Sequence, residues 1–342
     1  MAKTQNTKKK NSTKQKKTND QNKQILENIE NAKDGAPCRQ NMGPGCSVDT
    51  VQLKKNMKSH KELNLTKEDL LKALRNMMLA RYSDEKQLTL LKQGKAFFHI
   101  GGSGHEAAQT AIGFSIKPGH DWGWTYYRDS AYMYSLGYKP EEFFMLALAK
   151  PDDPATGGRQ MPNHYGHPGL NQPSQSSPTG TQFLNGVGTA LAAKKNGTDE
   201  LTYISGGEGA TSEGEFYEAV NWASREKLPA LFHIQDNGYA ISVPRERQSM
   251  GSTVGHSFCC YANLMMKTFD GTNYFESLKA ARDAVEHIRA GKGPVLLHAM
   301  VERLLPHSSS DDHRKYRPQE ELEQAKEKKD PIKNLVSYLI EN

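Results

Sequence analysis

The chain has 342 residues, a hydrophobic content of 36% and a formal net charge of +6. That length allows one large domain or two small ones, with enough apolar residues for a sizeable core. No run of 18 apolar residues occurs, so the composition excludes a membrane-spanning helix of ordinary length, and no membrane partner is expected.

The positive charge is concentrated at the start of the chain. Residues 1–24 contain eight lysines and one acid, Asp20, so this segment alone carries +7 and about −1 remains for the other residues. A basic nucleic-acid-binding face on the folded part is therefore not predicted. The segment is too poor in apolar residues to fold alone, and we expect residues 1–62 to be a disordered Lys-rich tail and linker. Weak electrostatic binding of this tail to RNA, a membrane or an acidic partner is the alternative.

The tail and the cysteines bear on the cellular compartment in which the protein is expected. The tail has neither the apolar core of a signal peptide nor the arginines and amphipathic pattern of a mitochondrial transit peptide. The four cysteines lack zinc-site spacing, and vicinal cysteines rarely form a structural disulfide. We predict reduced thiols in a cytoplasmic protein, with a Cys38–Cys46 link as the open alternative; the cysteines are Cys38, Cys46, Cys259 and Cys260.

A folded domain is predicted over residues 63–342. Its first helix begins after Thr66, with Asp69 placed as in a capping box, and ends before Gly94. Gly102 to Glu106 has the pattern of another helix start, to which we assign a positioning role. From Phe97 to Leu305 short apolar runs alternate with helical patterns, which predicts an α/β fold with a doubly wound, mostly parallel sheet flanked by helices.

Two predicted strands deliver polar residues to one edge of that sheet. Residues 201–204 form an apolar run that leads to Glu208, and residues 228–234 form a second run that leads to Asn237. An amphipathic helix containing Phe216 separates them. The carboxyl ends of parallel strands share one crevice, and Mg²⁺ prefers oxygen ligands, part of them from phosphate. The glycines on both sides of Glu208 allow close backbone approach to a diphosphate. Taken alone, Gly-Glu-Gly has a simpler interpretation, as an ordinary glycine-containing loop between a strand and a helix.

Two further polar segments precede these strands. Arg128 lies among aromatic residues in 122–129, and its guanidinium suits diphosphate oxygens, with a structural ion pair as the alternative. The turn at residues 175–182 leads into a helix that begins near Phe183. Either Thr181 or Ser177 caps that helix, or the hydroxyl and carbonyl oxygens of the turn bind a monovalent cation.

The C-terminal third adds one more loop at a strand end. Residues 274–290 form an amphipathic helix that ends at Gly291, and residues 295–301 form a buried strand. The following loop, 303–312, contains His307 and should lie at the same edge of the sheet. Residues from Pro318 to the C-terminus are predicted to be helical.

The strings GEGATSEGEFYEAVNWA (207–223) and QDNGYAIS (235–242) together resemble the thiamine diphosphate fingerprint. More narrowly, residues 64–342 resemble the alpha subunit of the 2-oxo acid dehydrogenase (decarboxylating) component, closest to the branched-chain type. The resemblance implies a thiamine-diphosphate-binding fold, diphosphate-binding half, with thiamine diphosphate and Mg²⁺ as cofactors.

The resemblance also implies roles for individual residues. The Mg²⁺ ligands would be Glu208, Asn237 and the backbone carbonyl of Tyr239. A potassium site would use Ser176, Pro178, Thr181 and Gln182. Cofactor contacts would come from Tyr127, Arg128, Ser177, Thr179, Gly207, Gly209, Ala210, Ile241, Arg303 and His307. The catalytic residue would be His307, which would lie beside the reacting carbon. Its imidazole, with a pKa near neutral, would shuttle a proton. In the Gly-Arg-x-Met-Pro pattern at 158–162, His164 would make a structural hydrogen bond or reach the substrate.

The implied activity is decarboxylation of a branched-chain 2-oxo acid and reductive acylation of a lipoyl group on the acyltransferase component. A beta subunit would complete the site in an α2β2 heterotetramer. Pyruvate or acetoin dehydrogenase is the alternative, and a non-catalytic scaffold a remote one. Ser308 matches a position phosphorylated in animal relatives and is taken as an unmodified loop serine. Gln235 stands where branched-chain relatives often have an arginine, so one phosphate contact is weaker or is supplied differently.

Overall fold

A computed structural model describes residues 59–248, 254–258 and 261–342. The Lys-rich segment 1–58 and all four cysteines lie outside the described residues. Within the described ranges, no helix is long and apolar enough to cross a membrane.

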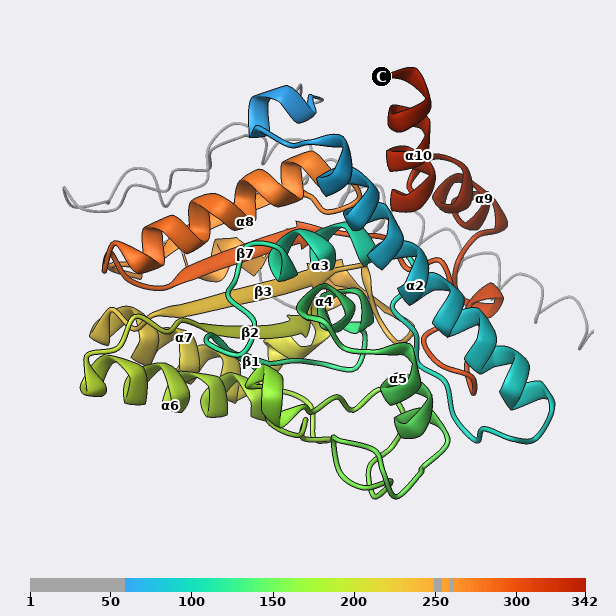
Figure 1. Cartoon of the computed structure of the whole chain (residues 1–342), viewed down its shortest axis with the longest axis horizontal. Helices are drawn as coiled ribbons and strands as arrows, with labels where there is room; N and C mark the ends of the chain where they lie inside the picture. Colours follow the sequence, from blue (N-terminus) through green and yellow to red (C-terminus); the bar gives the residue numbers. More distant parts are fainter. Residues whose placement is uncertain (1–58, 249–253, 259–260) are drawn as a thin grey trace, which may run out of the picture. The chain divides into compact units, whose positions relative to one another are not determined.

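A parallel sheet organises the domain (Figure 1). Among the described residues, five strands form it in the order β1-β2-β3-β7-β6, and every neighbouring pair is parallel. The strands are β1 (Trp122–Trp124), β2 (Thr202–Gly207), β3 (Ala230–Asp236), β6 (Met265–Asp270) and β7 (Val295–Met300). Predictions for β2, β3 and β7 are confirmed. Two strands were not predicted: β1, which is short, and β6, whose alternating burial marks an edge of the sheet.

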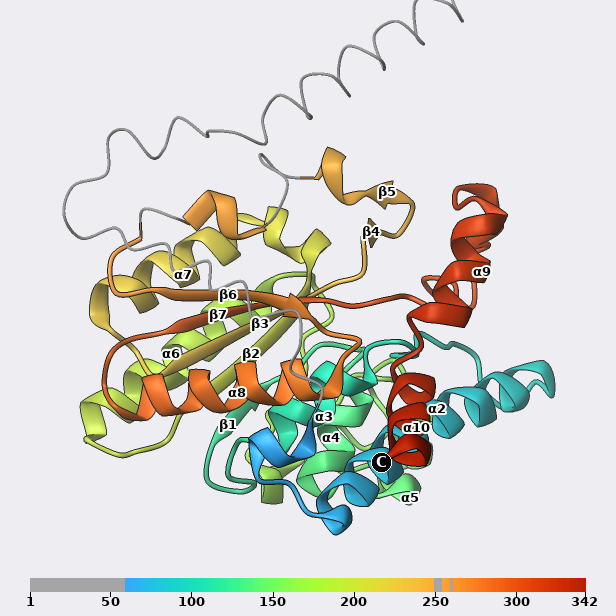
Figure 2. The same ribbon diagram turned by 90° about the horizontal axis from the view of Figure 1, so that it is seen from above.

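Helices cover both faces of the sheet, as predicted (Figures 1 and 2). One core contains Phe232 and Leu296 from the strands and packs against α6 (Thr181–Asn196) and α7 (Gly214–Glu226). The opposite core contains Leu231 and Leu297. It packs against α3 (Glu106–Gly113), α4 (Ser130–Leu136), α5 (Pro140–Ala147) and α8 (Tyr274–Arg289). Because side chains alternate between the faces of a strand, successive residues of β3 and β7 serve the two cores.

The remaining helices close one side of the domain. The helix α2 (Lys67–Lys92) begins at the predicted capping box, in which Thr66 and Asp69 exchange hydrogen bonds. It packs with α10 (Pro331–Glu341) and the short 3₁₀ helix η3 (His60–Leu63) in a third apolar cluster. The helix α9 (Gln319–Lys328) precedes α10, so the helical C-terminal region is also confirmed.

Two short elements lie beyond the strand ends. The 3₁₀ helix η5 (Glu208–Ser212) follows β2 directly. After β3 the chain forms a small antiparallel hairpin of β4 (Tyr239–Ala240) and β5 (Val243–Pro244). Both elements lie at the carboxyl edge of the sheet, where open α/β folds bind their ligands.

Candidate functional site

The ends of β2 and β3 bring Glu208 and Asn237 into contact. The strands pair in register up to Gly207 and Gln235, so the residues that follow leave the sheet together. Oε2 of Glu208 accepts a hydrogen bond of 3.2 Å from the backbone N–H of Asn237. Both side chains are buried. The structure therefore brings together the carboxylate and the amide that the sequence analysis paired.

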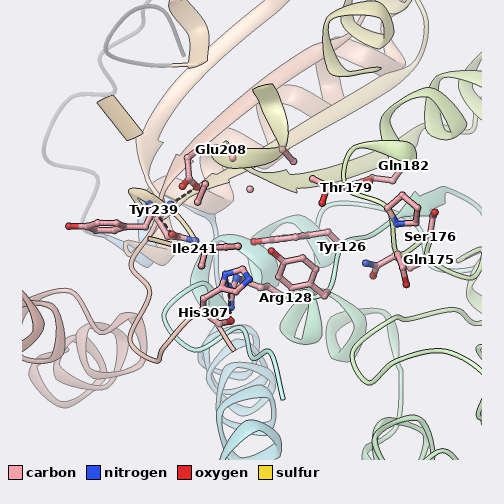
Figure 3. Close-up of a pocket in the computed structure, with 18 residues that line it drawn as sticks. Tyr126, Arg128, Gln175, Ser176, Thr179, Gln182, Glu208, Tyr239, Ile241 and His307 are labelled. Carbon is pink, nitrogen blue, oxygen red and sulfur yellow. Dashed lines mark hydrogen bonds between the residues drawn. The ribbon is translucent and has the colours of Figure 1, made fainter. Parts of the chain in front are cut away.

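These residues line a cavity of about 280 Å³ (Figure 3). Its wall comes from five segments that are distant in sequence: the residues after β1, the turn before α6, the end of β2, the end of β3 with the β4–β5 hairpin, and the loop after β7. Fifteen lining residues were predicted: Tyr127, Arg128, Ser176, Ser177, Pro178, Thr179, Gln182, Gly207, Glu208, Gly209, Ala210, Asn237, Tyr239, Ile241 and His307. Three were missed: Tyr126, Gln175 and Ala240.

Burial gives Glu208 an unusual acidity. Its carboxyl lies in a dry environment near the negative charge of Asp236, and both effects raise its pKa to about 7. Hydrogen bonds from nearby backbone N–H groups and from Gln248 oppose the rise. The protein alone thus compensates the charge of the carboxylate form poorly, and a cation beside Glu208 would favour that form.

The glycines flanking Glu208 are not equivalent. A Cβ on Gly209 would lie 2.6 Å from Cβ of Ala240, so the hairpin approaches η5 too closely for any side chain there. A Cβ on Gly207 would meet nothing closer than 3.9 Å. The fold itself therefore requires the glycine at 209, whereas the glycine at 207 leaves free space on the cavity wall.

Arg128 links the first and last segments of the wall. Its guanidinium donates to the carbonyl oxygen of Gly101, to that of His307 at 3.1 Å, and to Nδ1 of His307 at 3.2 Å. Burial, followed by the charges of Arg128 and Arg303, lowers the pKa of His307 to about 4. The expectation of a near-neutral pKa is thus wrong, because two guanidinium groups and desolvation disfavour the charged imidazole. At neutral pH His307 is an uncharged side chain.

Arg303 lies behind the cavity wall. It is 1% exposed, donates from Nη1 and Nη2 to the carbonyl of Ile241 at 3.1 Å each, and donates to the hydroxyl of Tyr316 at 2.7 Å. Ile241 has φ of 54°, a conformation that a β-branched residue rarely adopts. The structure therefore places Arg303 as the partner of a strained residue that lines the cavity, rather than on the wall itself.

The turn before α6 departs from the predicted cap. The N-cap is Gly180, with φ of 89° and no capping side chain. Thr181 is the first helical residue and does not line the cavity, and the hydroxyl of Ser177 donates to Gln160. Neither predicted cap forms, because glycine adopts the left-handed conformation of this turn without strain.

Comparison with known proteins assigns the family. The model for the dehydrogenase E1 component matches residues 74–342. This chain belongs to the dehydrogenase E1 component family.

Similar E1 proteins extend the match over most of the chain. The 2-oxoisovalerate dehydrogenase subunit alpha of Bacillus subtilis is 37% identical over 82% of this chain and 85% of its own length. The pyruvate dehydrogenase E1 component subunit alpha of Staphylococcus aureus is 31% identical over 81% of this chain and 71% of its own length. The same subunit of B. subtilis pyruvate dehydrogenase is 31% identical over equal shares. The family resemblance inferred from the motifs is confirmed.

Gln235 and Asp236, at the end of β3, bind other residues of the chain and do not line the cavity. Gln235 is fully buried and bonds to Asp129, Gln109 and His105 instead of facing the cavity. Asp236 bonds to His298 at 2.8 Å and to Arg245 at 3.0 Å, which attaches the hairpin to the sheet. Both are structural partners that spacing alone does not predict.

The remaining motif at 158–167 lies next to the cavity without lining it. Nδ1 of His164 is 3.2 Å from the carbonyl of Pro162, which is the structural hydrogen bond expected for it. Among the missed residues, Tyr126 had a usable signal, because it directly precedes Tyr127 and Arg128. Gln175 also had one, because it is the first residue of the polar turn at 175–182.

Proposed function

We propose that this E1 chain is the alpha subunit of a 2-oxo acid dehydrogenase that uses thiamine diphosphate and decarboxylates a branched-chain 2-oxo acid. The observation that carries the proposal is the meeting of Glu208 and Asn237 in a cavity that also contains Arg128 and His307. The identity to the 2-oxoisovalerate dehydrogenase subunit, higher than to the pyruvate dehydrogenase subunits, supports the branched-chain substrate.

The chemistry of the donor set fits Mg²⁺ bound through a diphosphate. The carboxylate of Glu208, the amide oxygen of Asn237 and the carbonyl of Tyr239 are hard oxygen ligands, as Mg²⁺ prefers. Among the described residues there is no group of three or more His, Cys, Asp or Glu side chains suited to a metal. A site with so few protein carboxylates is compatible with Mg²⁺, because this ion takes the rest of its shell from phosphate and water.

Backbone and basic groups around the cavity suit the rest of the cofactor. Gly207, Gly209 and Ala210 line the cavity at the start of η5, where their backbone N–H groups would contact diphosphate oxygens. Arg128 and Tyr127 would contact the charged end. Ser177, Thr179 and Ile241 would also contact the cofactor. A K⁺ ion would be bound by Ser176, Pro178, Thr181 and Gln182.

Thiamine diphosphate, when bound, supplies the electron sink that decarboxylation of a 2-oxo acid requires. The task of His307 follows from its hydrogen bond to Arg128. Because Arg128 only donates, Nδ1 of His307 accepts, and the proton of the neutral ring resides on Nε2. His307 can therefore donate a hydrogen bond from Nε2–H to a group in the cavity, while burial and the charge of Arg128 disfavour a second proton on the ring. Arg303 would act by positioning Ile241.

The proposal includes partners. A beta subunit would complete the site in an α2β2 heterotetramer, and a lipoylated acyltransferase component would accept the acyl group. A cytoplasmic location remains a prediction of the sequence alone.

Reconstitution with the beta subunit tests the proposal. We expect the tetramer, with Mg²⁺ and thiamine diphosphate, to release CO₂ faster from 3-methyl-2-oxobutanoate than from pyruvate, and this chain alone to release little. Faster turnover of pyruvate would favour the pyruvate dehydrogenase alternative. An absence of heat on calorimetric addition of Mg²⁺ and thiamine diphosphate to the tetramer would contradict the enzymatic assignment and favour a scaffold.

A further inference from the structure

We propose that His105 is a positioning residue that turns the amide of Asn237 so that its oxygen, and not its nitrogen, is available to a metal ion. The inference rests on the proposed function, in which Asn237 is a Mg²⁺ ligand. An asparagine amide has an acceptor at one end and two donors at the other, and a rotation of 180° about its last bond exchanges them. Only the oxygen can bind a cation, so the orientation of this amide decides whether the site is complete.

The orientation originates in the backbone. Oε1 of Gln109 accepts a 3.1 Å hydrogen bond from the N–H of Ala131, and Nε2 of Gln109 donates at 2.9 Å to the carbonyl of Arg128. A backbone N–H can only donate and a carbonyl can only accept. The Gln109 amide therefore has one possible orientation.

The hydrogen bond from Gln109 in turn determines the orientation of the Gln235 amide. Nε2 of Gln109 also donates to Oε1 of Gln235 at 2.8 Å, and Nε2 of Gln235 donates to Oδ1 of Asp129 at 2.7 Å. A donor on one side and a carboxylate on the other allow only this orientation of the Gln235 amide. Gln235 thus presents an acceptor oxygen to its next neighbour.

That neighbour is His105, whose two ring nitrogens receive opposite roles. Nδ1 lies 3.0 Å from Oε1 of Gln235 and must donate to it, so Nδ1 carries the proton. The hydroxyl of Tyr126 lies 3.3 Å from the same nitrogen. Nε2 is left as an acceptor, and Nδ2 of Asn237 lies 3.5 Å from it. The amide nitrogen of Asn237 is thereby attracted to the imidazole, and Oδ1 is left on the opposite side, where it accepts from the N–H of Tyr239 at 3.3 Å.

The surroundings of His105 hold its ring in place. His105 and Gln235 are 0% exposed, so water does not compete for these hydrogen bonds. His105 directly precedes α3, and a Cβ on the adjacent Gly104 would lie 2.1 Å from the carbonyl oxygen of Glu302. The N–H of Gly104 donates to Glu106 at 2.7 Å, and Glu106 is in turn bound by Arg81. The backbone that carries His105 is therefore tightly enclosed.

Two substitutions of similar size separate positioning from packing. In His105→Gln the longer side chain can place an amide oxygen near the former Nε2 and accept from Asn237. In His105→Asn the shorter side chain reaches only the Gln235 side. We expect the dissociation constant for Mg²⁺ in the presence of thiamine diphosphate to change less than about threefold in H105Q and to rise about 10- to 100-fold in H105N, as for other groups that orient metal ligands. Calorimetry on the full-length chain with its beta subunit measures both constants, and thermal melting shows whether each variant is folded.

A second readout follows the metal itself. With Mn²⁺ in place of Mg²⁺, water proton relaxation reports the number of water molecules on the ion. H105N should add water to the inner shell because the amide oxygen is lost, and H105Q should not. Equal effects of H105N and H105Q on affinity and on bound water would overturn the inference.

The tautomer of His105 supplies a test that needs no cofactor. Nitrogen-15 shifts of the imidazole in the wild-type chain should show the proton on Nδ1, and this signal should disappear in both variants. A proton on Nε2 would overturn the inference whatever the chain binds. If the tautomer is as stated but the wild type does not bind Mg²⁺ and thiamine diphosphate, the proposed function fails, and the metal-related part of this inference is overturned with it.

Discussion

Nη2 of Arg128 lies 3.2 Å from Nδ1 of His307 and 3.1 Å from its carbonyl oxygen. The contact joins a residue that follows β1 to the loop that follows β7, more than 170 positions later in the chain. An arginine has no acceptor, so this geometry determines which nitrogen of His307 carries the proton. The same guanidinium that was predicted to bind diphosphate therefore also controls the protonation of the predicted catalytic residue.

Removing the charge of Arg128 should make His307 more basic. The pKa of His307 is about 4, lowered first by burial and then by Arg128 and Arg303. In Arg128→Gln we expect this pKa to rise toward the ordinary value, so that His307 becomes protonated at a higher pH than in the wild type. NMR titration of the imidazole measures the change, and Arg128→Lys, which keeps the positive charge, is the control. An unchanged pKa in R128Q would mean that burial and Arg303 account for the shift without Arg128.

Binding of Mg²⁺ should release a proton from Glu208. Its carboxyl has a pKa of about 7 without a cation, and a divalent ion binds the carboxylate form. Because the carboxyl is largely protonated below pH 7, each further unit of acidification should weaken the contribution of Glu208 to apparent Mg²⁺ affinity by up to about tenfold. Calorimetry at pH 7 in buffers of different ionisation enthalpy counts the released protons. Glu208→Gln should lose this release and bind Mg²⁺ more weakly, and full proton release by E208Q would contradict the assignment.

The two glycines beside Glu208 should respond differently to alanine. Gly207→Ala should fold as the wild type does, because the added Cβ meets nothing closer than 3.9 Å. It should nevertheless weaken thiamine diphosphate binding, because the methyl group occupies the space predicted for a phosphate oxygen. Gly209→Ala should lower both the melting temperature and the affinity, since its Cβ would lie 2.6 Å from that of Ala240.

A third glycine serves as the control for this pair. Gly188 lies inside α6 with no atom within 4 Å of an added Cβ. Gly188→Ala should raise the free energy of unfolding by about 0.5–1 kcal/mol, through better helix propensity alone. If G207A binds thiamine diphosphate as tightly as the wild type does, the proposed contact between Gly207 and the diphosphate is wrong.

The strained backbone at Ile241 should be relieved by glycine. A non-glycine residue in the left-handed region costs about 1–3 kcal/mol, and Ile241 has φ of 54°. We expect Ile241→Gly to increase the free energy of unfolding while weakening cofactor binding, because the side chain on the cavity wall is lost. Val243→Gly, in the adjacent strand β5, should instead reduce stability. Chemical denaturation of both variants measures the difference, and a destabilised I241G would show that the strain is small.

The strands that lead to Glu208 and Asn237, the capped first helix and most residues of the cavity wall could be predicted from the amino-acid order. Apolar runs of strand length and helical periodicity are local properties of the chain, so they can be recognised without the fold. The family motifs allowed the residues of the loops at the strand ends to be predicted as well. The edge strand β6, with its weaker pattern of burial, and the short β1 lacked such a local signal.

Roles that depend on distant neighbours could not be predicted before the chain was seen folded. The low pKa of His307, the position of Arg303 behind Ile241 and the orientation of Asn237 through His105 all result from contacts between segments far apart in the sequence. Burial and charge act through space over a few ångströms, whereas a motif records only the order of residues. The amino-acid order therefore sufficed to predict which residues form the site. Their protonation states and the orientations of their side chains depend on packing.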